Sequence, residues 1–265
     1  MAADVAVFRC ECGGPLSPVL PDFDPGAVES DDRTVWRYRA MLPLTVGAKG
    51  APVTLGEGGT PHVALSLVGM PIQFKLEFLQ PTGSYKDRGS AVLATALAQS
   101  GPRVVVEDSS GNAGASMAAY LGRANIGLQL FVPQDATSGA LRQAEVYGAV
   151  VDQSASTRLQ AAQLAMDAVS KTQLYASHVY SPYFMAGVAT MAYEIWEDMG
   201  HQGPANVVLP IGQGVLLLGL YRGFLRLKAA GLIKRLPKFF GVQSRACAPI
   251  YDAFNRGADA TIEGI

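Results

Sequence analysis

Residues 104–123 read VVVEDSSGNAGASMAAYLGR, and this stretch decides the fold class. Three consecutive valines at 104–106 predict a strand that is buried on both faces. Turn-forming Ser, Gly and Asn residues follow, and the small residues at 113–123 predict a closely packed helix. A buried strand, a polar loop and a helix in succession form the unit from which parallel sheets are built.

The same unit recurs on both sides of this stretch. Apolar or alternating runs predict strands at 72–78, 104–106, 128–132, 150–151, 207–209 and 239–242, and 174–175 is strand-like. Helical patterns lie at 33–41, 86–99, 113–123, 139–147, 156–172, 185–199 and 216–230. The side chains expected to pack inward from 156–172 are Leu159, Ala162, Leu164, Ala165 and Val169. We therefore expect an α/β protein with a mainly parallel sheet, whose ligands bind in loops at the carboxyl ends of strands.

Composition excludes several classes of protein. The 265 residues are 49% hydrophobic and 16% charged, with a formal net charge of −1. Neither a disordered chain nor a basic nucleic-acid-binding surface is therefore expected. No apolar run approaches the ~20 residues that a membrane-spanning helix needs. Residues 1–8 lack a basic lead and a long apolar stretch, so no secretory signal is expected.

Cysteine usage indicates a reducing compartment. Three cysteines cannot build a disulfide framework, so we expect a cytoplasmic protein. Cys10 and Cys12 are separated by a single residue, and the chain has no second cysteine pair. Because structural zinc takes four ligands, no metal site is predicted.

One lysine, Lys86, stands between a glycine-containing loop and a predicted helix. Taken alone, a surface lysine is the more frequent explanation, because lysine is usually exposed. A helix N-terminus nevertheless disfavours a cation, and a neutral amine is what a Schiff-base lysine needs. The neighbouring Asp87 and Arg88 are expected to be a first-turn acid and a surface base.

Two more polar loops follow buried strands. Residues 108–114, DSSGNAG, form either an ordinary turn or a cradle of hydroxyls and amides that suits a carboxylate. Residues 210–216, PIGQGVL, place glycines where successive backbone N–H groups converge on an anion. The Gly-x-Gly-x-x-Gly spacing fails at Leu217, so a cofactor phosphate is a better candidate than a dinucleotide.

Taken together, the three loops resemble those of the fold-type II pyridoxal-phosphate enzymes, the tryptophan synthase β family. SYKDRG at 84–89 is similar to the Ser-Phe-Lys-Asp-Arg-Gly of threonine synthases, SSGNAG at 109–114 to a substrate and cofactor loop, and GQGVL at 212–216 to the phosphate loop. The resemblance implies two open, mainly parallel twisted sheets with flanking helices. It also implies an N-terminal arm at 1–50, a large cofactor-binding domain at 51–90 and 180–265, and a smaller mobile domain at 91–179.

The resemblance also implies a role for each loop residue. Lys86 would carry pyridoxal 5′-phosphate and then move substrate protons, and Asn112 would hydrogen-bond the phenolic oxygen of the cofactor ring. The substrate would be bound by Ser84, Ser109, Ser110 and Gly111. The cofactor phosphate would be bound by backbone amides of Gly212, Gln213, Gly214, Val215 and Leu216. The expected partner is a small amino-acid substrate, and family analogy favours a homodimer.

For a threonine synthase, the implied reaction converts O-phosphohomoserine and water to threonine and phosphate, a step of threonine biosynthesis. Two positions depart from that pattern, because Phe184 stands where many members have Arg and Ala189 where many have Lys. A PLP-dependent β-elimination or β-replacement enzyme, such as a serine or threonine dehydratase, is therefore kept as an alternative. A relative that binds the cofactor or an amino acid without turnover is a second, and an unrelated α/β protein with coincidental loops is a third.

Two further expectations concern single features. His178 could line the cleft, but we expect a satisfied or surface imidazole. Residues 260–265, ATIEGI, resemble a run that lies well inside such chains, so the sequence is interpreted as partial, and a partner for the pyridine nitrogen is expected downstream.

Overall fold

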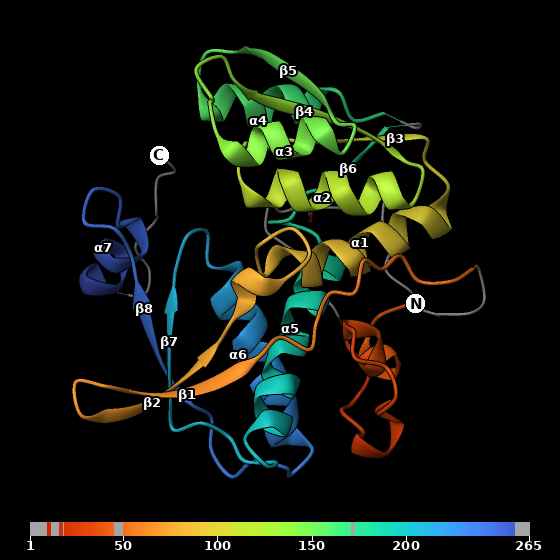
Figure 1. Cartoon of the computed structure of the whole chain (residues 1–265). Coiled ribbons are helices and arrows are strands. Elements are labelled where there is room, and N and C mark those ends of the chain that lie inside the picture. The colour runs from red at the N-terminus through yellow and green to blue at the C-terminus, as the bar shows by residue number, and fades with distance from the viewer. Residues whose placement is uncertain (1–9, 12–15, 18, 45–49, 171–172, 258–265) are drawn as a thin grey trace.

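Three sheets organise the residues that the computed structural model describes, which are 10–11, 16–17, 19–44, 50–170 and 173–257 (Figure 1). The largest sheet has four parallel strands in the order β5-β4-β3-β6. They are β3 (Val104–Glu107), β4 (Gly127–Pro133), β5 (Val150–Ala155) and β6 (Gln173–Tyr175). Val105 and Val106 are fully buried, so the valine run forms the interior strand that the sequence predicts.

Three helices accompany this sheet: α2 (Asn112–Arg123), α3 (Gly139–Val146) and α4 (Arg158–Asp167). The helix expected at 156–172 covers only Arg158–Asp167, and the Thr157 side chain caps its start by accepting a hydrogen bond from the Gln160 N–H. From that start, Ala161 and Ala165 face the core and are fully buried. Leu159, expected to pack inward, is 82% exposed, so that expectation is wrong.

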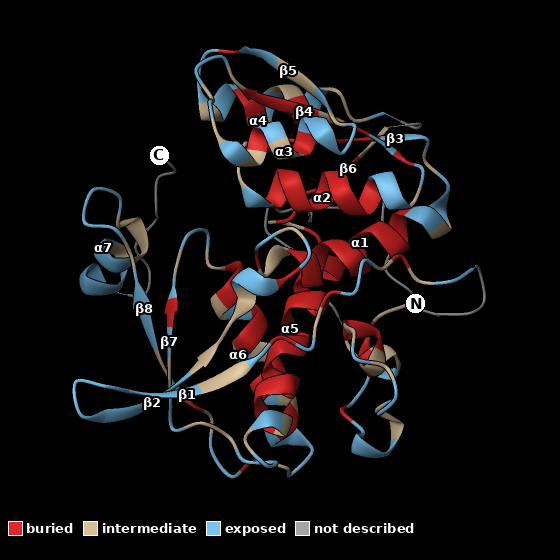
Figure 2. Ribbon diagram, in the orientation of Figure 1, coloured by how far each residue is buried: buried red, intermediate tan, exposed pale blue. Residues whose placement is uncertain are grey.

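A second group of helices carries the rest of the core. It consists of α1 (Lys86–Ser100), α5 (Pro182–Asp198) and α6 (Val215–Ala229). Helix α5 packs against both α1 and α6 and is buried along most of its length (Figure 2). Gly187 permits the close approach of α5 to α1, because a Cβ there would lie 2.0 Å from the Arg88 carbonyl oxygen. This packing holds the start of α1 firmly against α5.

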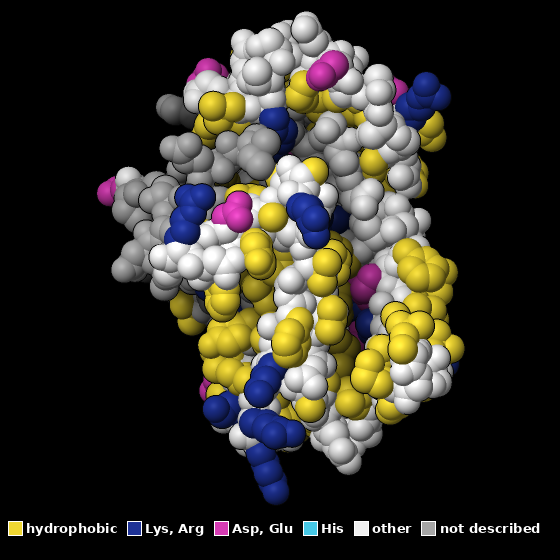
Figure 3. Space-filling model, turned by 90° about the vertical axis from the view of Figure 1, so that its left-hand side faces the viewer, with side chains coloured by type: hydrophobic (Ala, Val, Ile, Leu, Met, Phe, Trp, Pro, Cys, Tyr) yellow, Lys and Arg dark blue, Asp and Glu magenta, His cyan; other side chains and the backbone are white. Residues whose placement is uncertain are grey.

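Two smaller sheets flank these helices. β7 (Asn206–Pro210) pairs in parallel with β8 (Lys238–Val242), whereas β1 (His62–Leu67) and β2 (Met70–Lys75) form an antiparallel hairpin. Helix α7 (Pro249–Arg256), which the sequence analysis did not predict, follows β8. Phe240, Val242 and Phe254 are more than half exposed, and Figure 3 shows hydrophobic side chains gathered on the side of the molecule that carries these elements.

The hairpin corrects one predicted strand. The alternation suggests a strand at 72–78, but β2 ends at Lys75, and η3 (Glu77–Leu79) is a 3-10 turn. The Glu77 side chain turns inward to accept hydrogen bonds from Arg88, while Phe78 is 65% exposed. The ion pair between Glu77 and Arg88, and not strand pairing, therefore determines which side chains point inward after Lys75.

The N-terminal arm packs onto the body where the structure describes it. Its elements are η1 (Pro25–Ala27) and η2 (Val35–Met41), both 3-10 helices, so the short helix expected at 33–41 is confirmed in 3-10 form. Trp36 and Tyr38 are buried, and the Tyr38 hydroxyl donates to Glu197 at the end of α5. Across the described ranges, no helix has both the length and the apolar character required to cross a bilayer.

Candidate functional site

Lys86 is the first residue of α1 and follows a tight turn. Gly83 has a φ of +88°, a conformation that favours glycine, and its N–H donates to the Gln80 carbonyl at 2.9 Å. The Lys86 side chain is half-buried. Its Nζ donates to the Tyr85 hydroxyl at 3.1 Å and lies 4.6 Å from the centre of that ring. The turn therefore presents one amine at the beginning of a well-packed helix.

The Asp87 side chain holds this turn in place through hydrogen bonds. Its buried carboxylate accepts a hydrogen bond from the Thr82 N–H at 2.7 Å and another from the Ser116 hydroxyl at 2.6 Å. Burial raises the pKa of Asp87, and the hydrogen bonds from Ser116 and Thr82 oppose that shift. Because Ser116 belongs to α2, Asp87 ties the lysine loop to the helix that begins at Asn112.

Arg88 is fully buried, so the expectation of a surface base is wrong. Its guanidinium contacts Glu194 of α5 at 2.7 Å and Glu77 at 2.8 Å. Burial alone would raise the pKa of Glu194, but Arg88 and Lys75 lower it to about 2. A buried charge persists only when it is paired, and these pairs anchor the start of α1 behind Lys86.

The serine loop lies at the carboxyl end of β3. Gly111 caps α2, and the exposed Asn112 is its first residue. Ser110 is held through its carbonyl, which accepts from the Ser138 hydroxyl at 2.7 Å, and the Ser109 hydroxyl accepts from the Gly111 N–H at 3.3 Å. The hydroxyls and amides predicted to bind substrate thus gather at one helix start.

The glycine loop connects β7 to α6. Gly214 caps α6 with a φ of +90°, and Gly212 is exposed. Val215 and Leu216, the first residues of α6, bury their side chains. The N–H groups in the first turn of a helix have no partner within that helix, so this loop presents donors to an anion.

A chain of side chains connects the end of β3 to the glycine loop. His178 Nδ1 lies 2.5 Å from Glu107 Oε1, and His178 Nε2 lies 2.6 Å from Gln213 Oε1. The His178 ring also packs edge-on against Phe184, at 6.0 Å between ring centres, and Phe184 covers Gly89 of α1. His178 is therefore a satisfied imidazole, as expected. Sequence reasoning missed Glu107, although a carboxylate at the end of a buried strand is a signal that could have identified it.

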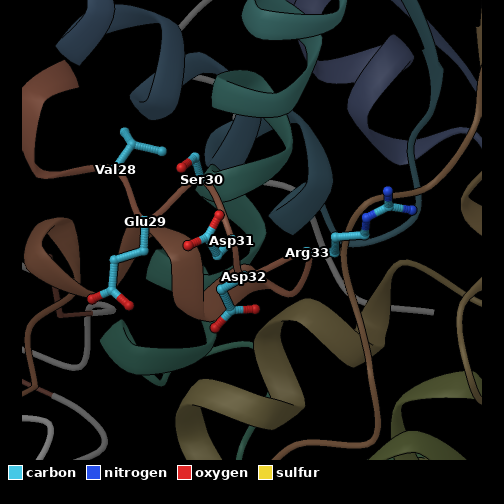
Figure 4. Close-up of a pocket in the computed structure, with 6 residues that line it drawn as sticks. All are labelled: Val28, Glu29, Ser30, Asp31, Asp32 and Arg33. Carbon is cyan, nitrogen blue, oxygen red and sulfur yellow. The ribbon is translucent and has the colours of Figure 1, made fainter.

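A surface hollow on the N-terminal arm is separate from these loops. Figure 4 shows its lining, which consists of Val28, Glu29, Ser30, Asp31, Asp32 and Arg33. Glu29 and Asp32 both pair with Arg39, at 2.8 Å and 3.2 Å. In the part of the chain that the structure describes, no group of His, Cys, Asp and Glu side chains could hold a metal ion. The candidate site therefore consists of the lysine, serine and glycine loops.

Comparison with curated proteins finds threonine synthases. The chain is 32% identical over 272 residues to the threonine synthase of Methanocaldococcus jannaschii, across 96% of this chain and 65% of that protein. It is 36% identical over 219 residues to the threonine synthase of Mycobacterium leprae, across 80% of this chain and 60% of that protein. The chain thus spans less than two thirds of the length of these relatives.

Comparison with solved structures finds the same fold. Maize serine racemase matches with a TM-score of 0.65 at 20% identity, over 74% of this chain and 59% of that one. The L-serine ammonia-lyase of Rhizomucor miehei matches with a TM-score of 0.64 at 18% identity, over 74% of this chain and 63% of that one. These similarities support the expected fold class, an α/β architecture with parallel sheets and flanking helices.

The family model described as "Pyridoxal-phosphate dependent enzyme" matches residues 53–265, which include all three loops. Pyridoxal phosphate is the cofactor of this family. Because the match covers most of the sequence, the chain belongs to the pyridoxal-phosphate dependent enzymes, as the resemblance predicts.

Proposed function

We propose that this chain is a threonine synthase-like lyase that uses pyridoxal 5′-phosphate to convert O-phosphohomoserine and water to threonine and phosphate. The observation that carries the proposal is the placement of Lys86 at the start of α1, with Asp87 and Arg88 buried behind it. The identity to threonine synthases over 96% of the chain supports the choice of reaction.

The residues present fit the cofactor. The Ser84 hydroxyl oxygen is buried and has no hydrogen-bond partner among the described residues, which leaves a donor and acceptor free for a ligand. The Lys86 amine is half-buried beside the Tyr85 hydroxyl, and the glycine loop presents helix N–H groups. An amine and an anion cradle are the groups that an aldehyde with a phosphate tail requires, and the free hydroxyl is left for the substrate.

We assign the holding roles as follows. Lys86 would bind the cofactor covalently through Nζ, Asn112 would donate to its ring oxygen, and amides of 212–216 would hold its phosphate. When bound, the cofactor supplies an electron sink for charge that develops at the substrate α-carbon.

The protein's own part in the reaction is to position the substrate and move protons. Backbone and hydroxyl donors of Ser109, Ser110 and Gly111 would bind the substrate carboxylate and so orient its α-proton. Lys86 Nζ would take that proton and return it at a later step, as a general base and then a general acid. Tyr85, whose hydroxyl accepts from Nζ at 3.1 Å, would keep the amine aimed between these transfers.

Phe184 and Ala189 favour a second candidate. Phe184 is fully buried against Gly89, and Ala189 is buried where α5 packs on Gly223 of α6. Neither can bind the phosphate of O-phosphohomoserine, so β-elimination or β-replacement on a smaller amino acid is the alternative activity. Binding without turnover is the other.

One comparison of products tests these candidates. The chain reconstituted with pyridoxal phosphate is expected to release phosphate from O-phosphohomoserine, and Lys86→Ala is expected to abolish release. Borohydride reduction followed by peptide mass analysis should place the pyridoxyl group on Lys86. Ammonia and keto acid from L-serine or L-threonine, without phosphate release, would establish the dehydratase instead. A pyridoxyl group on another lysine would refute the site.

The division into a large domain at 51–90 and 180–265 and a smaller mobile domain at 91–179 stays a prediction. The expected homodimer and the cytoplasmic location stay predictions as well.

A further inference from the structure

Three side chains from three separate parts of the fold form one chain of contacts. Glu107 ends β3, His178 follows β6, and Gln213 belongs to the glycine loop after β7. The contacts are 2.5 Å from Glu107 Oε1 to His178 Nδ1 and 2.6 Å from His178 Nε2 to Gln213 Oε1. These contacts therefore connect the four-stranded sheet with the loop that precedes α6.

The polar side-chain atoms of Glu107 and His178 in this chain of contacts have hydrogen-bond partners. Glu107 is fully buried, and its second oxygen accepts from the Ser109 N–H. His178 is 4% exposed, and each of its ring nitrogens faces an oxygen atom. The Glu107 carboxylate accepts from Nδ1, and Nε2 shares a hydrogen bond with the side-chain amide of Gln213. Both ring nitrogens of His178 are therefore engaged by side chains, and neither is left without a partner.

The other charged groups nearby are already paired. Arg158 of α4 contacts Asp108 at 2.5 Å, and the Tyr175 hydroxyl donates to Asp108 at 2.6 Å. The neighbour from α5 is the uncharged ring of Phe184. Glu107 is thus the carboxylate that faces His178 among the described residues.

We infer that Glu107, His178 and Gln213 form a positioning relay that fixes the glycine loop in the shape that receives the cofactor phosphate. Gln213 is exposed and lies between Gly212 and Gly214. Glycine loses more backbone freedom than any other residue when it is ordered. A loop that is ordered beforehand binds its ligand more tightly, because less ordering remains to be done on binding. The inference rests on the proposed cofactor site for the identity of the ligand, although the relay itself belongs to the chain alone.

Histidine ring NMR on the cofactor-free chain tests the relay directly. The chain has 3 histidines, so His178→Asn identifies the signals of His178. We expect the Nδ1 proton of His178 to be protected from solvent exchange, because it lies in the hydrogen bond to the buried Glu107. Gln213→Ala should shift the Nε2 resonance of His178, and Glu107→Gln should shift its Nδ1 resonance. The exposed Gln202→Ala is the matched control and should change neither. An Nδ1 proton that exchanges freely with solvent, or a ring unaffected by Gln213→Ala, would overturn the relay.

Pyridoxal phosphate affinity tests its purpose. Gln213→Ala keeps the backbone amides and removes one hydrogen bond, so we expect the Kd to rise about tenfold. His178→Asn should raise the Kd by a similar factor, and the double variant should lose little more than either single variant. Effects that multiply fully would mean that the two residues act independently, which contradicts a relay. A wild-type chain that binds no pyridoxal phosphate would refute the proposed function, and the NMR measurement would still decide the relay.

Discussion

Phe184 lies so close to Gly89 that a Cβ added to the glycine would come within 2.6 Å of three ring carbons. Gly89 is the fourth residue of α1, one turn beyond Lys86, and Phe184 is in the first turn of α5. The contact therefore sets the separation of the two helices at the end where the candidate site lies. Phe184, which departs from the threonine synthase pattern, therefore packs against the helix that begins at Lys86.

Gly89→Ala is expected to lower the free energy of unfolding by about 1–3 kcal/mol, the usual effect of overpacking a core. Urea unfolding at a fixed pH measures the change. The matched control is Gly139→Ala at the start of α3, where an added Cβ meets nothing within 4 Å. Adding Phe184→Leu should recover part of the loss, and a strictly additive double variant would contradict direct contact.

Ser84→Ala separates ligand binding from folding. The Ser84 hydroxyl is buried without a partner among the described residues, so its removal should leave the stability of the cofactor-free chain unchanged or raise it by about 1 kcal/mol. If Ser84 meets the substrate, KM should rise about tenfold, which corresponds to one lost hydrogen bond. Ser90→Ala is the contrast, since the Ser90 hydroxyl is hydrogen-bonded to the Ser116 hydroxyl at 2.7 Å, and its removal should cost stability without raising KM. An unchanged KM in Ser84→Ala would remove Ser84 from the site.

Glu57 should make the protein less stable as the pH rises above the acid range. Burial raises the pKa of Glu57 above its ordinary value of 4.5, although the Leu55 N–H and the Tyr120 hydroxyl donate to it. The folded state then binds the proton more tightly than the unfolded state does, so stability falls from pH 4.5 up to the raised pKa.

Glu57→Gln mimics the protonated form, and at neutral pH it should raise the free energy of unfolding by about 1–2 kcal/mol. Its stability should also vary less with pH than that of the wild type, as measured by urea unfolding across a pH series. Glu145→Gln on the exposed side of α3 should change neither quantity. A Glu57→Gln variant that is less stable at neutral pH would show that Glu57 is ionised in the fold.

Arg88→Met should be strongly destabilising, because the half-buried Glu77 loses its cation and the buried Glu194 keeps only Lys75 as its paired cation among the described residues. Removal of one partner of a buried pair costs about 3–5 kcal/mol. Thermal unfolding of the cofactor-free chain measures the loss, and Arg123→Met, at an exposed position, is the control. Glu194→Gln in the Arg88→Met background should restore part of the stability. A mild effect of Arg88→Met alone would show that the pair does not anchor α1.

The Arg88–Glu194 pair should also make the stability of the protein depend on pH in the acid range. Although burial opposes it, Arg88 lowers the pKa of Glu194 from 4.5 to about 2. The stability from Glu194 is therefore fully present above pH 4.5 and is lost as the pH falls toward 2. Glu194→Gln should flatten this acid limb of the stability curve.

The local pattern of residues in the sequence determined the strands, helices and loops that form the candidate site. Val105 and Val106 are buried because β-branched side chains favour a strand and leave no polar face, whereas Val104 at the start of the strand is 37% exposed. The loops at 83–86, 109–112 and 212–214 end where helices begin, since glycine and small polar residues interrupt regular structure and cap the next helix. Such features depend on neighbours along the chain, so a pattern can predict them.

Tertiary packing decided which of these residues are buried and which partners they find. Arg88 and Glu194 are 106 positions apart, and His178 meets carboxylate and amide partners 71 and 35 positions away. No local pattern carries that information, because the free energy of burying a charge or an imidazole depends on whether a distant group arrives to pair with it. The sequence thus determined where the candidate loops begin and end. The folded core decided that Arg88 supports Lys86 and that Glu107 and His178 reach the glycine loop.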